Sequence, residues 1–151
     1  MKHIIVILIF VLSFGTLVAQ DDFIELLRKD VTAEKTAVIT EIMAFTDSES
    51  KIFWPLYREY DFERSKIDDQ RMALIKDYAE HFENITDEKA DEITRRSFKY
   101  RQQLVKLEQK YYKKLAKALS AKTAARFFQL DNQLNSLITL QITSNLPLIE
   151  H

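Results

Sequence analysis

The near absence of glycine is the feature that most limits what this chain can fold into. The sequence has 151 residues but one glycine, Gly15, and only two prolines, Pro55 and Pro147. Tight turns between strands need residues that tolerate positive φ, and glycine and asparagine are the main ones. Lysine, glutamate, alanine and leucine are abundant instead, and these residues favour helices. The composition therefore predicts an all-α protein.

The first 19 residues have the pattern of a secretory signal peptide. Lys2 precedes an apolar run from Ile4 to Leu12, and a looser segment ends at Ala19. The run is shorter than the roughly 20 apolar residues that a membrane span needs, although an uncleaved N-terminal anchor is the alternative. We expect cleavage after Ala19, which leaves residues 20–151 as a single all-α domain without a stable membrane span.

The chain contains no cysteine, so disulfides cannot hold the exported domain together. Its stability must come from helix packing or from oligomerisation. A thin helical layer leaves apolar surface that a second copy can bury. We therefore expect a homodimer.

Three similar stretches predict where helices begin. They read FTDSESKIF from Phe45, ITDEKADEI from Ile85 and LSAKTAARF from Leu119. Each places Thr or Ser after an apolar residue, and such hydroxyls cap helix N-termini. The expected cap positions are Thr46 with Glu49 as a capping box, Thr86, and, more weakly, Ser120.

The spacing of these starts predicts a long helical hairpin with shorter flanking helices, about four helices in all, in a thin, cradle-like layer. The two hairpin helices can have about 35 and 30 residues, or roughly 45 to 50 Å. A shorter helix from about Asp22 to Met43 precedes them, and another from Ala121 to about Leu140 follows.

Apolar residues recur at helical spacing in the last two predicted helices. The expected seams comprise Ile93, Tyr100, Leu107, Leu104, Tyr111 and Ala118 in one helix, and Phe127, Leu130, Leu134, Leu137 and Ile138 in the other. The middle of the helix after Thr46 offers only Phe62 and Ile67. We expect that middle to be solvated on more than one side.

Charge changes sign along the chain. Residues 41–92 hold 15 acidic and 7 basic side chains, whereas residues 95–122 hold 10 basic side chains and one acidic, Glu108. A stripe on the later helix comprises Lys99, Lys106, Lys110, Lys113 and Lys117. Either the stripe pairs with the acidic helix across the hairpin, or it forms a basic surface for acidic or unfolded polypeptides.

The sequence contains few residues of the types and patterns that catalytic sites need. Beyond the signal segment there are two histidines, His81 and His151, with no cysteine and no glycine-rich phosphate loop. Adjacent carboxylates such as Asp68 and Asp69 are typical of solvated helix faces. His81 with Asp77 at i−4 is better interpreted as a polar flank than as a metal site. We expect no enzyme activity, no cofactor and no metal.

The helix starts resemble the Leu-Thr-x-x-Gln (LTXXQ) motif of the Spy/CpxP family of periplasmic proteins of Gram-negative bacteria. The signal peptide, the cysteine-free composition and the chain length agree with that resemblance. The motif stands as Phe45-Thr46-Asp47-Ser48-Glu49 and as Ile85-Thr86-Asp87-Glu88-Lys89, with a fainter Leu119-Ser120-Ala121-Lys122-Thr123. The glutamine is absent from all three, so the resemblance is to a divergent branch.

The resemblance implies a periplasmic dimer that holds unfolded or partly folded envelope proteins without ATP, as a chaperone of the envelope stress response. The alternative is a regulatory ligand of an envelope sensor or an anti-sigma system, without general chaperone activity. Nucleic acid is not an expected partner. The candidate client-binding residues are Arg58, Arg64, Arg71, Lys99, Lys106 and Lys113, with Tyr57, Tyr60 and Tyr100 as apolar neighbours.

Overall fold

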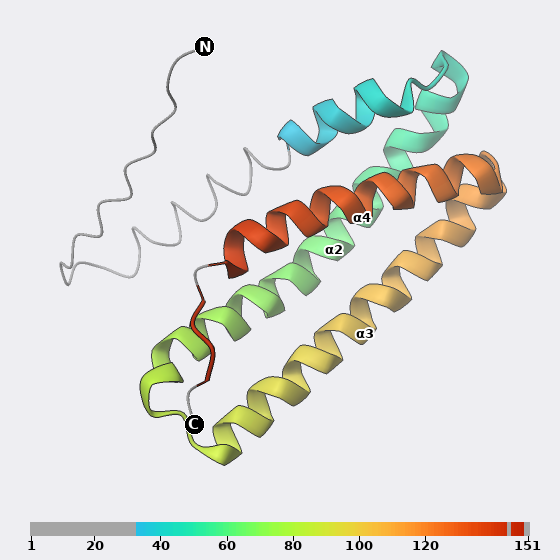
Figure 1. Cartoon of the computed structure of the whole chain (residues 1–151). Helices are drawn as coiled ribbons and strands as arrows, with labels where there is room; N and C mark the ends of the chain where they lie inside the picture. The colour runs from blue at the N-terminus through green and yellow to red at the C-terminus, as the bar shows by residue number, and fades with distance from the viewer. Residues whose placement is uncertain (1–32, 145, 150–151) are drawn as a thin grey trace, which may run out of the picture. The chain divides into compact units, whose positions relative to one another are not determined.

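The computed structural model describes residues 33–144 and 146–149 (Figure 1). The chain divides into two compact units, residues 1–37 and 38–151, which are treated separately. In the first unit the described residues, 33–37, are helical. The predicted signal peptide and the first part of the predicted helix from Asp22 lie outside the described residues.

The described residues are almost entirely helical, which confirms the all-α prediction. A helix that includes residues 33–43 precedes α2 (Asp47–His81), and a single 3-10 turn, η1 (Phe82–Asn84), follows α2. The chain continues as α3 (Asp87–Ala118) and α4 (Ala121–Thr143). Together these are four α-helices within the described ranges, and α2 and α3 have the lengths that the sequence predicts.

Each of the three predicted hydroxyl residues begins a helix. Thr46 accepts from the backbone N–H of Glu49 at 3.3 Å, and Glu49 Oε2 accepts from the backbone N–H of Thr46 at 3.0 Å. Thr86 caps α3 through the N–H of Lys89, and Ser120 caps α4 through the N–H of Thr123. The hydrogen bonds from Thr46 also hold the pKa of Glu49 below its ordinary 4.5. Local hydrogen bonding therefore explains where all three helices begin.

The lack of glycine has a visible consequence before α2. Ala44 adopts a φ of 48°, in the left-handed region that glycine usually occupies after a helix. The N–H of Ala44 donates to the carbonyl of Thr40 at 3.3 Å. A residue with a Cβ therefore makes this turn against its steric preference.

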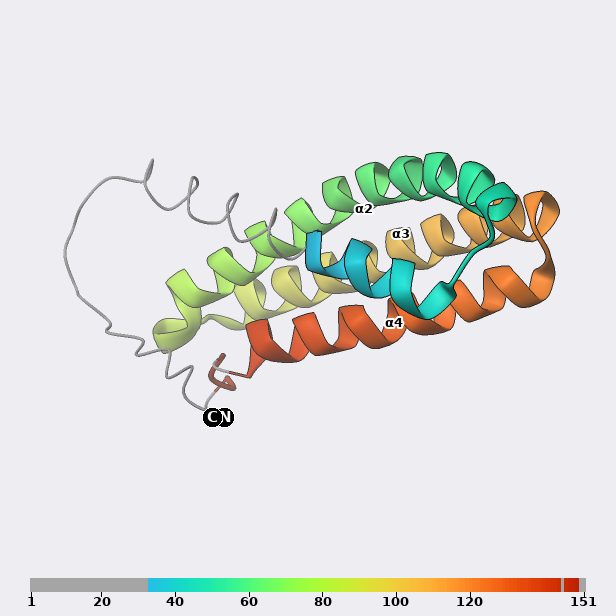
Figure 2. The same ribbon diagram turned by 90° about the horizontal axis from the view of Figure 1, so that it is seen from above.

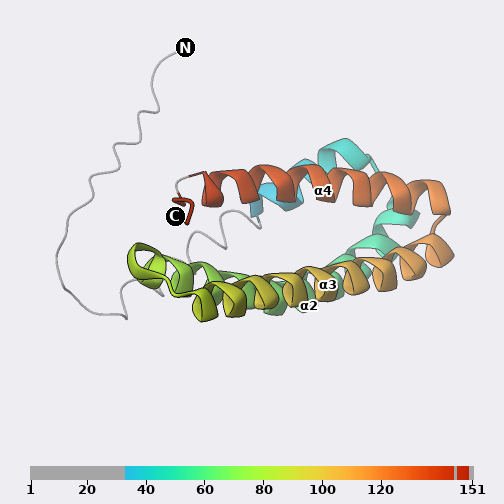
Figure 3. The same ribbon diagram turned by 60° about the horizontal axis from the view of Figure 1, so that its bottom comes forward.

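Within residues 38–151, α2 and α3 form an antiparallel hairpin, which confirms the predicted one (Figures 1 and 2). Helix α4 runs back along this hairpin and lies on one side of it (Figure 3). Beyond α4, the hydroxyl of Tyr78 donates to the carbonyl of Pro147 at 2.6 Å, so the chain after α4 contacts the C-terminal part of α2.

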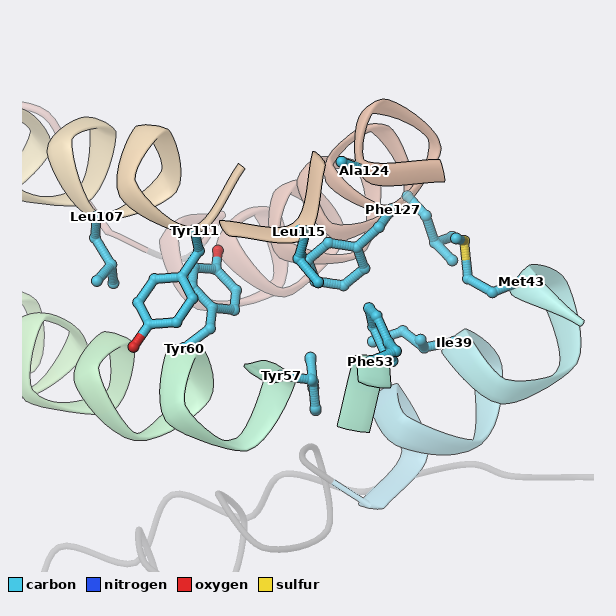
Figure 4. Packing of buried hydrophobic residues seen from close by; sticks show 11 residues of the cluster. Ile39, Met43, Phe53, Tyr57, Tyr60, Leu107, Tyr111, Leu115, Ala124 and Phe127 are labelled. Carbon is cyan, nitrogen blue, oxygen red and sulfur yellow. The ribbon is translucent and has the colours of Figure 1, made fainter. Parts of the chain in front are cut away.

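The apolar core occupies the end of the hairpin where α3 turns into α4. Figure 4 shows aromatic rings from α2, α3 and α4 facing one another there. The rings of Phe53 and Phe127 lie 5.1 Å apart, and those of Tyr60 and Tyr111 lie 5.4 Å apart. The buried cluster comprises Ile39, Met43, Phe53, Tyr57, Tyr60, Leu107, Tyr111, Leu115, Ala124, Phe127 and Leu130.

Two members of the expected apolar seams are exposed, and several others are only half-buried outside the core cluster. Ala118 is exposed at the last residue of α3, and Leu137 is 62 % exposed on α4. The buried cluster on α4 ends at Leu130. Helical spacing therefore predicts the face of the helix but not how far along the helix the core extends.

Candidate functional site

Three of the predicted client-binding residues are buried in the folded chain. Tyr60 is 0 % exposed, Tyr57 belongs to the same aromatic cluster, and Arg64 is buried one turn after Tyr60. This corrects their predicted placement on a binding surface. The interpretation of the middle of α2 as solvated on several sides also fails at Arg64, because its flank toward α3 and α4 is filled by a polar cluster.

That polar cluster joins three helices. The Tyr60 hydroxyl donates to Asp131 Oδ2 on α4 at 2.8 Å, and Arg64 Nη1 donates to the Tyr60 oxygen at 2.8 Å. Arg64 Nη1 also lies 3.5 Å from Glu108 Oε1 on α3 and 3.5 Å from Asp131 Oδ2. Asn135 donates to the same Asp131 oxygen.

The charges of this cluster are mutually stabilised. Burial and the neighbouring Asp131 carboxylate raise the pKa of the Tyr60 hydroxyl, which stays protonated. Burial alone lowers the pKa of Arg64, but Tyr60, Asp131 and Asp68 together raise it above its ordinary value. Hydrogen-bonded and ion-paired groups of this kind orient helices, and their burial excludes them from contact with a macromolecular partner.

Part of the predicted lysine stripe pairs with α2, as one of its two interpretations requires. Lys110 Nζ of the stripe lies 2.7 Å from both carboxylate oxygens of Glu63. Lys114, which is not part of the predicted stripe, makes a similar pair, with its Nζ 2.9 Å from Glu59 Oε2. The hydrogen bonds from Lys110 and Tyr111 hold the pKa of Glu63 below its ordinary 4.5. These pairs join the two hairpin helices beside the apolar core.

A second group of ion pairs closes the opposite end of the hairpin. Asp77 of α2 contacts Lys89 at 2.9 Å and Arg96 of α3, and His81 Nδ1 lies 3.2 Å from Asp77 Oδ1. The hydrogen bond from Lys89 is the main cause of the lowered pKa of Asp77. Asp77 is thus engaged by cations. The described residues contain no group of three or more side chains that could hold a metal ion.

Three of the four remaining lysines of the stripe form a solvent-facing row. Lys99, Lys106 and Lys113 are exposed, and within the described residues none of them takes part in an ion pair. Their seven-residue spacing places them in one column of α3. The basic surface predicted from the charge distribution is therefore present at these three residues.

The other predicted site residues do not join this row. Arg58 is exposed on α2, and Tyr100 is half-buried on α3. Arg71 donates to Thr139 Oγ1 on α4 at 3.1 Å, which gives it a structural contact. The nine predicted residues therefore do not form one site, and only the lysine row presents several of them on one face.

Beside this row, α3 also has an exposed column of apolar residues that is absent from the sequence-based prediction. Phe98, Val105 and Tyr112 of α3 are 53, 50 and 38 % exposed, and each directly precedes a lysine of the row. The signal that could have identified them is the dipeptide of an apolar residue and lysine, repeated three times at seven-residue spacing. The predicted seams occupy other columns of the same helix.

The α3 face, defined as Phe98, Val105 and Tyr112 with Lys99, Lys106 and Lys113, is the candidate functional site. Apolar side chains on such a face can enter a partner's surface while ammonium groups attract acidic groups nearby. No helix in the described ranges has the length and apolar character needed to cross a membrane. Comparisons with protein-family models, with curated proteins and with solved structures found no match.

Proposed function

We propose that this chain is an exported, periplasmic binding protein that holds unfolded or partly folded envelope proteins without ATP, in the manner implied by its resemblance to the Spy/CpxP family. The proposal includes the predicted homodimer and excludes catalysis. Its location depends on the signal peptide that the first 19 residues predict. The Thr46, Thr86 and Ser120 caps belong to the scaffold of this protein rather than to its binding face.

One observation carries the proposal: the α3 face combines apolar and cationic side chains that are largely exposed, and of its three apolar members only Tyr112 makes a ring contact with another helix, at 6.2 Å from Phe128 of α4, within the described residues. Other basic residues of α3, such as Lys110 and Arg96, are used in pairs with α2. Phe98 and Val105 are about half exposed, although burial of each would stabilise the fold by about 1 to 2 kcal/mol. Exposed apolar groups rimmed by charge are typical of a protein-interaction surface.

The test is light scattering of a chemically denatured client protein diluted into buffer with the purified chain, without ATP. We expect aggregation to be suppressed near one dimer per client and suppression to weaken with salt, because exposed charge contacts are screened over about 8 to 10 Å. No suppression at large excess would rule out general chaperone activity.

Substitutions connect this activity to the lysine row. Lys99→Gln, Lys106→Gln and Lys113→Gln together should weaken suppression without lowering the melting temperature. A matched control removes three lysines elsewhere, namely Lys51, Lys66 and Lys122. If the row variant loses thermal stability and keeps full suppression, the row is structural and the proposed site is wrong.

The regular spacing of Phe98, Val105 and Tyr112 supports a second candidate, a regulatory ligand of one envelope sensor or anti-sigma system. A column at seven-residue spacing suits one helix of one partner better than many disordered chains. Pull-down under native conditions separates the two candidates. Many captured proteins support the chaperone, whereas one stoichiometric partner supports the regulator.

A further inference from the structure

We propose that the α3 face recognises an acidic amphipathic helix, within either a client or a dedicated partner. This inference rests on the proposed binding function and names the conformation and charge of the element that is bound. It follows from the spacing of the apolar residues, the sign of the flanking charges and the width of the face.

The apolar column has the geometry of one half of a coiled-coil seam. Phe98, Val105 and Tyr112 are seven residues apart on a continuous helix of 32 residues. An α-helix turns by about 100° per residue, so such positions drift only about 20° per heptad and stay on one face. A second helix with apolar residues at the same period can pack along the column. An extended chain fits less well, because its same-face side chains repeat at about 6.6 Å, whereas one heptad of helix rises about 10.5 Å.

The flanking charges favour an acidic occupant. Lys99, Lys106 and Lys113 border the column on one side, and the guanidinium of Arg101 lies 5.2 Å from the centre of the Phe98 ring. Between residues 97 and 117 the single acidic residue, Glu108, contacts Arg64 in the polar cluster. Carboxylates on the partner would complement this field, as they do at the flanking positions of coiled coils.

A second copy of this chain is a poor occupant of the same face. Two α3 helices packed column to column, in either direction, would bring the lysine rows of both copies beside one seam. Like charges there destabilise the pair. The predicted homodimer therefore needs a different surface.

A membrane surface is also disfavoured, because the apolar column is narrow. Gln102 and Gln109 are exposed on α3 close to the column, and the lysine row lies on the same side. Helices that lie in a membrane interface bury a broad apolar face with large side chains. A single column fits between the side chains of one helix instead.

The experiment uses the purified protein and a labelled synthetic peptide of about four heptads, with leucine at the seam positions and glutamate beside them. A second peptide has the same composition in an order without helical period. Fluorescence anisotropy should show that the periodic peptide binds at least about tenfold more tightly, and that its affinity falls with salt.

Variants then place the peptide on the α3 face. Phe98→Ser with Val105→Ser should weaken binding at least about tenfold, because the seam loses two of its apolar contacts. The matched control is Leu137→Ser with Leu140→Ser, which removes two side chains that are 62 and 63 % exposed on α4. Changing Lys99, Lys106 and Lys113 to Glu should transfer the preference to a lysine-bearing peptide of the same period.

Several outcomes would overturn the inference. If both peptides bind equally well, the bound element need not be a helix. If the Phe98→Ser/Val105→Ser variant binds the periodic peptide with unchanged affinity, the peptide does not bind to the α3 face. Binding to vesicles with anionic lipid that is lost in the same variant, without peptide binding, identifies a membrane surface instead.

The same samples are tested for suppression of client aggregation, which separates this inference from the proposed function. Suppression without peptide binding means that the helix inference is wrong and the holding function stands. Peptide binding without suppression means that general holding is wrong while the helical partner stands. If neither occurs, both are wrong.

Discussion

The hydroxyl of Tyr60 on α2 lies 2.8 Å from Asp131 Oδ2 on α4, and both side chains are 0 % exposed. These residues are 71 positions apart in the sequence. Arg64 completes the contact by donating to the Tyr60 oxygen. A hydroxyl that accepts from a cation and donates to a carboxylate couples the register of α2 to that of α4.

We expect Tyr60→Phe to lower the free energy of unfolding by about 1 to 3 kcal/mol, because Asp131 loses a donor and Arg64 loses an acceptor in a buried place. Asp131→Ala should cost more, about 3 to 5 kcal/mol, since it leaves the Arg64 charge without this carboxylate. Urea unfolding followed by circular dichroism measures both. Tyr112→Phe on the exposed face of α3 is the control and should change little; a similar loss there would contradict the argument.

Acid should weaken the ion-paired end of the hairpin. The pKa of Asp77 is lowered from its ordinary 3.8 in the folded state, chiefly by the hydrogen bond from Lys89. A lowered folded-state pKa means that the stabilisation is complete above pH 3.8 and is lost as the pH falls through the lowered value. Lys89 and Arg96 likewise lower the pKa of Glu92 from its ordinary 4.5, so the stabilisation from Glu92 is also lost as the pH falls through that lowered pKa.

The check is the free energy of unfolding measured between neutral pH and pH about 3, for the unmodified chain and for Asp77→Asn. The unmodified chain should lose stability toward the acid end, and the variant should lose less over the same range. Parallel pH profiles would show that Asp77 does not contribute this stabilisation.

The two halves of α3 should differ in hydrogen exchange. The described residues of α3 include no buried side chain before Leu107, whereas Leu107, Tyr111 and Leu115 are buried in the core. Segments with few buried apolar contacts open at lower free energy than the core. Amides of residues 93–103 should therefore exchange about tenfold or more faster than those of residues 107–115.

Asp77→Asn should accelerate exchange in the first half of α3 and leave the second half nearly unchanged, because the ion pairs with Lys89 and Arg96 lie only in the first half. Uniform protection along α3 would show that the hairpin opens as one cooperative unit.

Glycine should improve the turn before α2. We expect Ala44→Gly to raise the free energy of unfolding by about 0.5 to 1 kcal/mol, because Ala44 has a φ of 48° and its Cβ disfavours that region. Ala125→Gly, at an exposed position inside α4, is the opposite control and should lower it by about 1 kcal/mol. Thermal unfolding of the two variants measures both changes. A less stable Ala44→Gly variant would contradict the steric argument.

The elements of this fold could be predicted from sequence because their signals are local. The lack of glycine excludes most tight turns, and each cap hydroxyl at Thr46, Thr86 and Ser120 binds an N–H three residues away. Helix lengths follow from the distances between these caps. The lysine row was predictable as a column for the same reason, since helical period depends on neighbouring residues alone.

The packing could not be predicted in this way, because it depends on which column of each helix meets another helix. On α3, the columns of Leu107 and Val105 have similar apolar content, yet one is buried and the other exposed. Arginine is usually a surface residue. Arg64 is nevertheless buried, because α4 places Asp131 beside its guanidinium group. By itself the sequence determined the helices, their starts and their charged columns. Only the tertiary structure decided which columns were buried, since that choice depends on contacts between residues far apart in the chain.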